Sequence, residues 1–455
     1  MFFNLYWILF FYIQLLVFLL FLSFSYSRIL SYFGFIIFFI IYFFFYLSLN
    51  YSDLNFIILI KFYNLNWLNI SYIIGMDFLS ISFILLCSFL LVYCLLIYWN
   101  LKYKINLYIF CLFFSLWLLL NVFSSLDLFF FYIYFEGIVI PMFFLIGIWG
   151  SRSRKIYASY QFFIYTLIGS IFVLLCFMSI YFNIGSSSFL YFYECNFFSN
   201  RALIFFLVMF LGFAVKIPTI PLHIWLPEAH VEAPTPGSVI LAGILLKLGT
   251  YAILRLLLCL FKFNIYFDII FFILTLSLVG FTYASMVALS QIDIKKIIAY
   301  SSIAHMNFGL FGLFSFNTVG IVGLIILMFG HAITSGALFL GVGVLYDRYK
   351  TRLIFYYGSL IIFMPLFAIC YFIFILSNFG FPGTFNFVGE FLILIGGFYC
   401  SNVIIILSSF GMILTLIYSL SLYNRIFFGS LYVIFIRYYS EVSRLDIIYY
   451  KHFLF

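Results

Sequence analysis

Long apolar runs separated by short polar connections fill most of the sequence. A run of about 20 apolar residues can cross the hydrocarbon core of a bilayer as a helix. About thirteen such runs are present, at residues 5–25, 32–49, 77–98, 105–124, 128–149, 157–182, 202–223, 237–260, 268–288, 297–316, 319–346, 360–397 and 402–425. Only 7% of the 455 residues are charged, too few for the surface of a soluble domain. The sequence therefore predicts an all-α polytopic membrane protein with about 13 transmembrane helices.

Basic residues gather in alternate connections between these runs, including residues 102–104, 152–155, 295–296 and 348–352. The intervening connections carry almost no net charge. The positive-inside rule places the basic loops in the cytoplasm or the mitochondrial matrix and the N-terminus on the opposite side. We therefore interpret the net charge of +8 as loop bias and predict no nucleic-acid partner.

The first apolar run lacks a basic flank and a cleavage site, so we interpret it as a span and not as a signal or transit peptide. The 71 phenylalanines and 38 tyrosines indicate an AT-rich coding genome, which suits an organelle. The eight cysteines are scattered and form no CxxC or other metal-binding spacing.

Two of the runs are interrupted by proline within a polar stretch. The first interruption follows Lys216, and the second, at 381–390, ends at Glu390. Proline cannot continue a helix, and paired broken helices at corresponding positions are typical of inverted repeats in transporters. We expect two inverted five-helix repeats, each with a broken helix. The expected parts are N-terminal helices with a connecting loop at 1–104, repeats at 105–260 and 261–428, and a tail at 429–455.

Ionisable side chains lie inside the apolar runs. A lysine at the bilayer centre costs about 2.5–3.5 kcal/mol on insertion scales, and such residues usually mark ion or proton pathways. They predict a proton relay, although groups that only hold helices together remain an alternative. The candidate relay residues are Glu136, Lys216, Lys247, His305, His331 and Glu390.

The positions of these residues suggest separate roles. We expect Glu136 to pair with Lys216, beside the helix break, and so to set the proton affinity of that lysine. Lys247 lies between long apolar stretches, where a desolvated lysine can exchange protons. Histidine titrates near neutrality, so His305 and His331 could connect Lys247 to Glu390, the acidic end of the path.

A polar segment follows the first break and carries His223, Glu228, His230 and Glu232. With three prolines, it reads as a rigid polar loop at 225–236, and its spacing fits no standard zinc motif. The sequence also has no GxGxxG motif, P-loop or helix with paired histidines suited to haem. We therefore expect no metal or cofactor on this chain.

The segment FAVKIPTIPLHIWLPEAHVEAPTPGSVILAGILLK, with YFEGIVIPMF, SSIAHMNFG and GFPGTFNFVGEF, resembles the subunit 4 family of NADH dehydrogenase. These are antiporter-like membrane subunits of respiratory complex I. The resemblance runs from about residue 75 to residue 443. It implies that Glu136, Lys216, Lys247 and Glu390 match the family's proposed proton-channel residues, with His305 and His331 as connecting groups. Members of this family usually have a further span after the stretch that reads SEVSRLDIIYY in this chain. The tail is therefore expected to lack the usual last helix.

The resemblance implies a proton-translocating subunit of NADH:ubiquinone oxidoreductase in the mitochondrial inner membrane. Its expected partners are the lipid bilayer and other membrane-arm subunits, namely the antiporter-like subunits 2 and 5 and the lateral helix of subunit 5. NADH, FMN, iron–sulfur clusters and ubiquinone are expected in the assembled complex and not on this chain. Two alternatives stay open: a cation/proton antiporter subunit without redox partners, and a structural spacer of the membrane arm.

Overall fold

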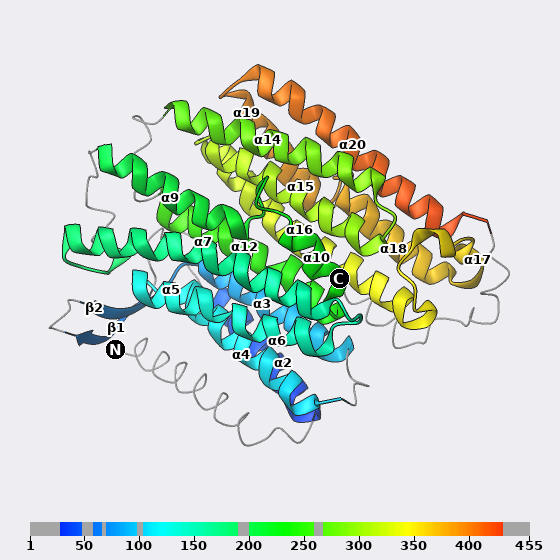
Figure 1. The fold of residues 1–455 in the computed structure, drawn as a ribbon, viewed down its shortest axis with the longest axis horizontal. Coiled ribbons are helices and arrows are strands. Elements are labelled where there is room, and N and C mark those ends of the chain that lie inside the picture. The colour runs from blue at the N-terminus through cyan, green and yellow to red at the C-terminus, as the bar shows by residue number, and fades with distance from the viewer. Residues whose placement is uncertain are drawn as a thin grey trace. The chain divides into compact units, whose positions relative to one another are not determined.

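The structure, a computed structural model, describes residues 28–47, 58–65, 70–97, 103–189, 200–258 and 267–430. The span predicted at 5–25 and nearly all of the tail predicted at 429–455 lie outside these residues. The chain divides into two compact units, with the boundary between Phe198 and Ser199 (Figure 1). Each unit is described by itself.

The first unit consists of helices and one β-hairpin. Its elements are α2 (Arg28–Leu47), β1 (Ile58–Leu65), β2 (Ile70–Met76), α3 (Phe78–Ile97), α4 (Ile105–Ser124), α5 (Leu128–Gly137), α6 (Val139–Trp149) and α7 (Lys155–Ile184).

The second unit is helical and contains both helix breaks. Its elements are α9 (Asn200–Lys216), α10 (Trp225–Glu232), α11 (Thr235–Ile240), the π-helix η1 (Leu241–Leu245), α12 (Leu246–Ala252), the π-helix η2 (Ile253–Leu257), α14 (Phe267–Ser290), α15 (Ile294–Phe314), α16 (Thr318–Tyr349), the 3₁₀-helix η4 (Ile354–Tyr356), α17 (Leu360–Phe363), α18 (Pro365–Asn378), α19 (Phe385–Phe398) and α20 (Asn402–Phe427).

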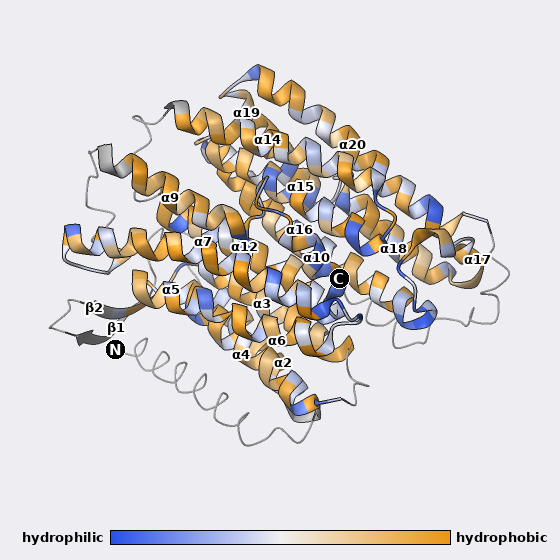
Figure 2. Ribbon diagram, viewed as in Figure 1, coloured by the Kyte–Doolittle hydropathy of each residue, from blue (hydrophilic) through white to orange (hydrophobic). Residues whose placement is uncertain are grey.

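The predicted polytopic helical fold is confirmed. Within the described residues, nine helices are long and apolar enough to cross a membrane, and four shorter apolar helices accompany them. The run predicted at 105–124 is α4, and the run at 128–149 is α5 followed by α6. Figure 2 shows that apolar residues dominate along the helices and that many hydrophilic residues lie at their ends.

The β1–β2 hairpin was not predicted, since residues 58–76 were expected to be part of a connecting loop. Its strands pair antiparallel from Ile58 opposite Met76 to Leu65 opposite Ile70. β1 has two isoleucines in eight residues and β2 has three in seven, each strand also has one tyrosine, and both are too short to cross a bilayer, which favours a hairpin. The Leu126 amide donates to the Ile73 carbonyl at 2.9 Å, which ties β2 to the connection between α4 and α5.

Both predicted helix breaks are present. α9 ends at Lys216, and α18 ends at Asn378 before α19 begins at Phe385. The predicted polar loop at 225–236, however, is wrong, because α10 is a helix there and most of its residues are buried. Pro227 is the third residue of α10, where a helix tolerates proline because the first-turn amides have no acceptor within the helix.

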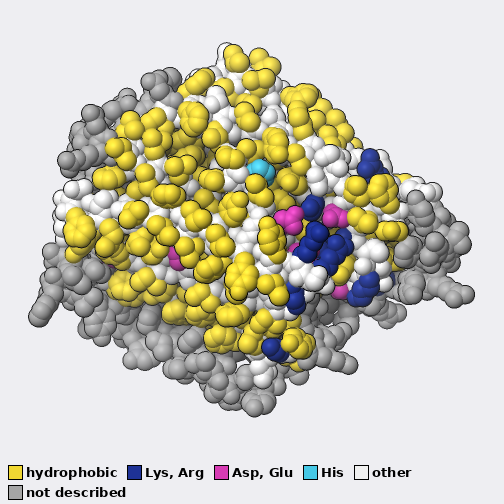
Figure 3. Space-filling view, viewed as in Figure 1, with side chains coloured by type: hydrophobic (Ala, Val, Ile, Leu, Met, Phe, Trp, Pro, Cys, Tyr) yellow, Lys and Arg dark blue, Asp and Glu magenta, His cyan; other side chains and the backbone are white. Residues whose placement is uncertain are grey.

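Many large apolar side chains point outwards, as expected when the solvent is lipid. On α20 these side chains are Val403, Ile406, Leu407, Phe410, Ile413, Leu416 and Ile417. Figure 3 shows one face of the molecule, on which hydrophobic side chains cover most of the described surface and charged side chains gather in one area. Among the described residues, exposed charges lie in connections and near helix ends, as in the partly exposed Lys296–Glu228 pair and the exposed Lys350–Asp347 pair.

Candidate functional site

Lys247 is completely buried in α12, between the π-helices η1 and η2. Its Nζ atom donates a hydrogen bond to the Ala242 carbonyl and lies 2.9 Å from Nδ1 of His331. These two acceptors take the place of water around a lysine in the middle of a span. The flanking π-helices are also notable, because single π-turns occur frequently at functional sites.

His331 and His305 come from neighbouring helices, α16 and α15. Their ring centroids are 5.4 Å apart, with an angle of 51° between the ring planes. Nδ1 of His305 then lies 3.4 Å from Oε1 of Glu390 on α19. Lys247 and His331 are 0% exposed, His305 is 1% exposed and Glu390 is 4% exposed. The structure thus brings four of the six predicted residues into one buried line.

Close packing of α16 against α19 brings Glu390 to this line. A Cβ atom on Gly389 would lie 2.8 Å from the backbone nitrogen of Leu327, so the two helices touch through their backbones there. Small residues permit such approaches between membrane helices. Asn386 strengthens the contact, because its Nδ2 lies 3.4 Å from Oγ1 of Thr334 and 2.8 Å from the Ser377 carbonyl.

Only the first step of the line, between Lys247 and His331, is a hydrogen bond. When the Lys247 ammonium donates to Nδ1 of His331, the proton of a neutral His331 is on Nε2, an assignment that follows from the hydrogen-bond partner. Within the described residues, neither Nε2 of His331 nor either ring nitrogen of His305 has a hydrogen-bond partner, so the 3.4 Å approach of His305 to Glu390 is not a hydrogen bond. A proton that passes between the two rings, or from His305 to Glu390, therefore requires a side-chain movement or a bridging water.

The other two predicted residues lie at helix ends. Lys216 is the buried last residue of α9, in the second unit. Glu136, in the first unit, lies near the end of α5 and is partly exposed. Pro141 cannot donate to the Gly137 carbonyl, which explains the break between α5 and α6 beside Glu136. The pairing of Glu136 with Lys216 stays a prediction.

A buried charge cluster was missed by the sequence analysis. Nη1 of Arg352 lies 3.5 Å from Oε1 of Glu232, and both side chains are buried. The Arg352 guanidinium also lies 5.1 Å from the ring centroid of Tyr346. Lys295 is also buried, and its Nζ atom donates a hydrogen bond to the Ala233 carbonyl at 2.9 Å. All three charged residues lie in segments that were predicted to be loops, where charged side chains are usually hydrated. The sequence pattern therefore did not indicate that they are buried.

The polar residues that follow the first break have different surroundings. His230 is buried and stacks on Phe339 with a centroid distance of 4.6 Å. Glu228 pairs with Lys296 at 3.1 Å. Within the described ranges, no three His, Cys, Asp or Glu side chains come together as a possible metal site.

A protein family model and several known proteins match the part of the chain that contains this site. The transmembrane model of the NADH:quinone oxidoreductase/Mrp antiporter family matches residues 125–416. NADH-ubiquinone oxidoreductase chain 4 of Acanthamoeba castellanii is 50% identical over 360 residues, which cover 78% of this chain and 71% of that protein. Chain 4 of Chondrus crispus is 50% identical over 356 residues, which cover 78% and 72%.

A solved structure has a similar fold. A chain in the structure of respiratory complex I from Thermus thermophilus with bound NADH superposes with a TM-score of 0.86 at 25% sequence identity. The superposition covers 97% of this chain and 93% of that chain. All six candidate residues lie within the span of the matched family model.

Proposed function

The chain belongs to the NADH:quinone oxidoreductase/Mrp antiporter family as a relative of NADH-ubiquinone oxidoreductase chain 4, and we propose that it moves protons through the line Lys247–His331–His305–Glu390. It is a multi-pass membrane subunit of complex I in the mitochondrial inner membrane. NADH, FMN, the iron–sulfur clusters and ubiquinone belong to the chemistry of the assembled complex, and this chain contributes proton transfer.

One observation carries the proposal: four ionisable side chains from α12, α16, α15 and α19 meet in sequence inside the second unit. Buried ionisable groups are costly in a membrane protein and usually mark ion or proton pathways. Ionisable groups with a purely structural role need only form one pair that holds two helices together. A series of four titratable groups on four elements also gives a proton successive places to bind.

The proposed driving step acts on the Glu136–Lys216 pair. Reduction of quinone elsewhere in the complex shifts this pair, and loss of the carboxylate lowers the proton affinity of Lys216. A proton is then displaced along Lys247 and the two histidines toward Glu390. Moving one charge against about 150 mV requires roughly 3.5 kcal/mol. Because 1.4 kcal/mol is a factor of ten, a change of about 300-fold in the proton affinity of one lysine matches this requirement.

The proposed architecture places these groups in two inverted repeats, residues 105–260 and 261–428. The paired breaks at Lys216 and before Phe385 support this assignment. The partners are other membrane-arm subunits of complex I. We propose the antiporter-like subunits 2 and 5 and the lateral helix of subunit 5 as the neighbours that contact this chain.

The test is proton translocation per electron in membranes that carry Lys247→Ala. Electron transfer to an artificial acceptor measures assembly independently of pumping, and Lys296→Ala serves as a control for a partly exposed lysine. We expect quinone-coupled pumping to fall while the complex stays assembled and the control pumps normally. Unchanged pumping per electron in Lys247→Ala would remove this lysine from the path and refute the relay.

Two rival functions give different results in the same membranes. An antiporter subunit without redox partners would transport protons in a sodium-dependent manner when electron transfer is blocked. A structural spacer would lose assembly in Lys247→Ala and keep normal pumping in each complex that does assemble. The proposed relay predicts neither pattern.

A further inference from the structure

Asn386 lies one turn before Glu390, on the same face of α19. Both side chains are buried, whereas Val388 between them points outwards. The face that carries Asn386 and Glu390 packs against α16, the helix of His331. Asn386 therefore stands where the second helix break, the acidic end of the relay and one of its histidines come together.

The Ser377 carbonyl, in the last turn of α18, loses its helical partner at the break. In a continuous helix it would accept a hydrogen bond from the Phe381 amide, four residues further on. That amide instead donates to the Leu376 carbonyl at 3.1 Å, and the Gly380 amide reaches Ser377 only at 3.4 Å. Nδ2 of Asn386 donates to the Ser377 carbonyl at 2.8 Å. This side chain therefore supplies the missing donor and joins the two halves of the broken helix.

The Asn386 side chain also contacts the turn of α16 that carries His331. Its Nδ2 lies 3.4 Å from Oγ1 of Thr334, three residues after His331. A Cβ atom on Gly330, the residue before His331, would collide with Oδ1 of Asn386 and would lie 3.1 Å from its backbone nitrogen. These contacts on both sides of His331 define how α19 sits against α16.

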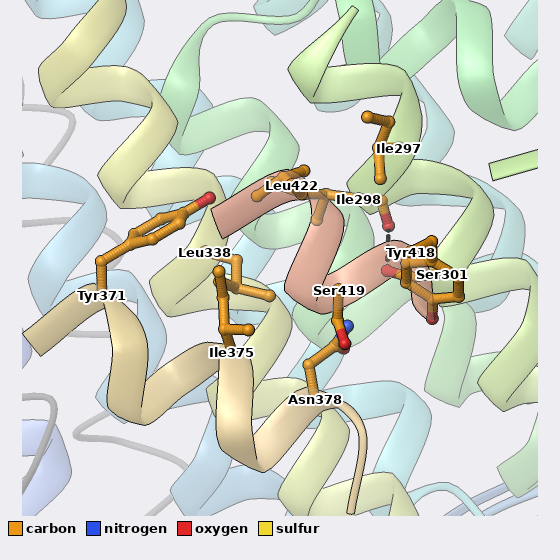
Figure 4. Close-up of a pocket in the computed structure, with 10 residues that line it drawn as sticks. All are labelled: Ile297, Ile298, Ser301, Leu338, Tyr371, Ile375, Asn378, Tyr418, Ser419 and Leu422. Atoms are coloured by element: carbon orange, nitrogen blue, oxygen red, sulfur yellow. Dashed lines mark hydrogen bonds between the residues drawn. The ribbon is translucent and has the colours of Figure 1, made fainter. Parts of the chain in front are cut away.

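Packing alone does not hold the last turn of α18. A cavity of about 10 Å³ with an almost wholly apolar surface lies beside this turn, where Ile375 and Asn378 line it (Figure 4). Atoms that line a void lack contacts on that side, so packing holds them less firmly. The position of this turn against α19 therefore depends on the directional hydrogen bond from Asn386.

We propose that Asn386 is a positioning residue of the relay, which holds Glu390 in line with His305 and His331 by fixing α19 to both α18 and α16. The inference rests on the proposed relay function and adds the residue that sets the geometry of its acidic end. His305 and Glu390 are 3.4 Å apart without a hydrogen bond, so a small displacement of α19 changes the gap that a proton must cross. Asn386 itself carries no proton, because a side-chain amide does not titrate near neutral pH.

The first test compares two asparagines that each tie α19 to a neighbour. Asn386→Ala removes the bond at the break. Asn317→Ala is the matched control, because Nδ2 of Asn317, directly before α16, donates to the Gly396 carbonyl of α19 at 2.9 Å, away from the break. We expect proton translocation per electron to fall to the level of Lys247→Ala in the first variant and to stay normal in the second, with artificial-acceptor activity unchanged in both.

A density map of each variant complex measures the positioning itself. The separation of Nδ1 of His305 from Oε1 of Glu390 should exceed 3.4 Å in Asn386→Ala and stay at this value in Asn317→Ala. A merely structural role would lower the amount of complex and leave this separation and the pumping per electron unchanged.

A milder pair of variants covers the case in which Asn386→Ala does not assemble. Thr334→Val and Thr415→Val each remove one buried hydroxyl that bonds to the carbonyl three residues before it, at 3.3 and 2.7 Å. Only the Thr334 hydroxyl also contacts Asn386. We expect pumping per electron to fall in Thr334→Val, by less than in Lys247→Ala because the bond to Ser377 remains, and to stay normal in Thr415→Val.

The outcomes separate this inference from the proposed function. Normal pumping in Asn386→Ala, or equal losses in Asn386→Ala and Asn317→Ala, together with a loss in Lys247→Ala, overturns the positioning role and leaves the relay standing. Equal pumping by the two threonine variants overturns it in the same way. Normal pumping in Lys247→Ala refutes the relay and this inference with it.

Discussion

Nζ of Lys247 lies 2.9 Å from Nδ1 of His331, with both side chains completely buried. At this distance the two nitrogens can share one proton, but they cannot both be cationic without strong repulsion in a poorly solvated site. Protonation of one group therefore opposes protonation of the other. This exclusion is what a relay needs, because the arrival of a proton on Lys247 drives a proton off its neighbour.

His331→Gln tests this exchange directly. Glutamine offers a carbonyl oxygen that can still accept a hydrogen bond from Lys247, but it cannot be protonated near neutral pH. We expect normal assembly with reduced proton translocation per electron, measured against artificial-acceptor activity. Leu324→Met, a volume-conserving change on the same helix, should cost less than about 1.5 kcal/mol and leave pumping normal. Normal pumping by His331→Gln would mean that His331 is only structural.

Two glycines in the second break form a matched pair for testing the position of Glu390. Gly380 and Gly383 both have positive φ values, of 70° and 98°. A Cβ atom on Gly380 would collide with Oε2 of Glu390, whereas a Cβ atom on Gly383 would meet nothing within 4 Å. Alanine at either site carries a backbone cost of roughly 1–2 kcal/mol.

Gly380→Ala should therefore also displace the Glu390 carboxylate from His305 and reduce pumping per electron. Gly383→Ala should lose a similar amount of stability and pump normally. Thermal denaturation and proton translocation of the two variants, measured side by side, check this expectation. Equal pumping by both variants would show that the relay does not depend on the exact position of Glu390.

The buried Arg352–Glu232 pair is expected to matter for stability. Removing one partner of a buried ion pair costs about 3–5 kcal/mol, because the other charge stays buried. Glu232→Gln should therefore lower the amount and the thermal stability of the assembled complex. Lys350→Ala is the control: Lys350 is 70% exposed and 3.9 Å from Asp347, and such a pair is worth about 0–1 kcal/mol. Equal stability of the two variants would contradict the role given to the buried pair.

The spans and both helix breaks were predictable because they depend on local chemistry. Apolar length alone defines α4 and α7, and proline alone defines the end of α9 at Lys216. The relay residues stood out because a charged group inside an apolar run has few structural explanations. Their order in space was not predictable, since His305 and His331 meet through the packing of α15 against α16 and not through sequence spacing.

Burial of charge in connecting segments could not be predicted from the sequence. Glu232 and Arg352 are 120 residues apart, and each alone reads as a hydrated loop residue. α10 was missed for a related reason: Pro227 suggests a turn unless the helix is known to begin at Trp225. The β1–β2 hairpin was overlooked because the runs that form it are too short to cross a membrane.

The most direct measurement of the central claim is a double-variant comparison of Lys247→Ala and Glu390→Gln. Proton translocation per electron is measured in each single variant and in the combined variant, with artificial-acceptor activity as the assembly control. If both residues serve one path, each single change removes the share pumped by this subunit, and the combination removes no more. Normal pumping in either single variant, or a combined loss equal to the sum of two separate losses, would contradict a single continuous relay.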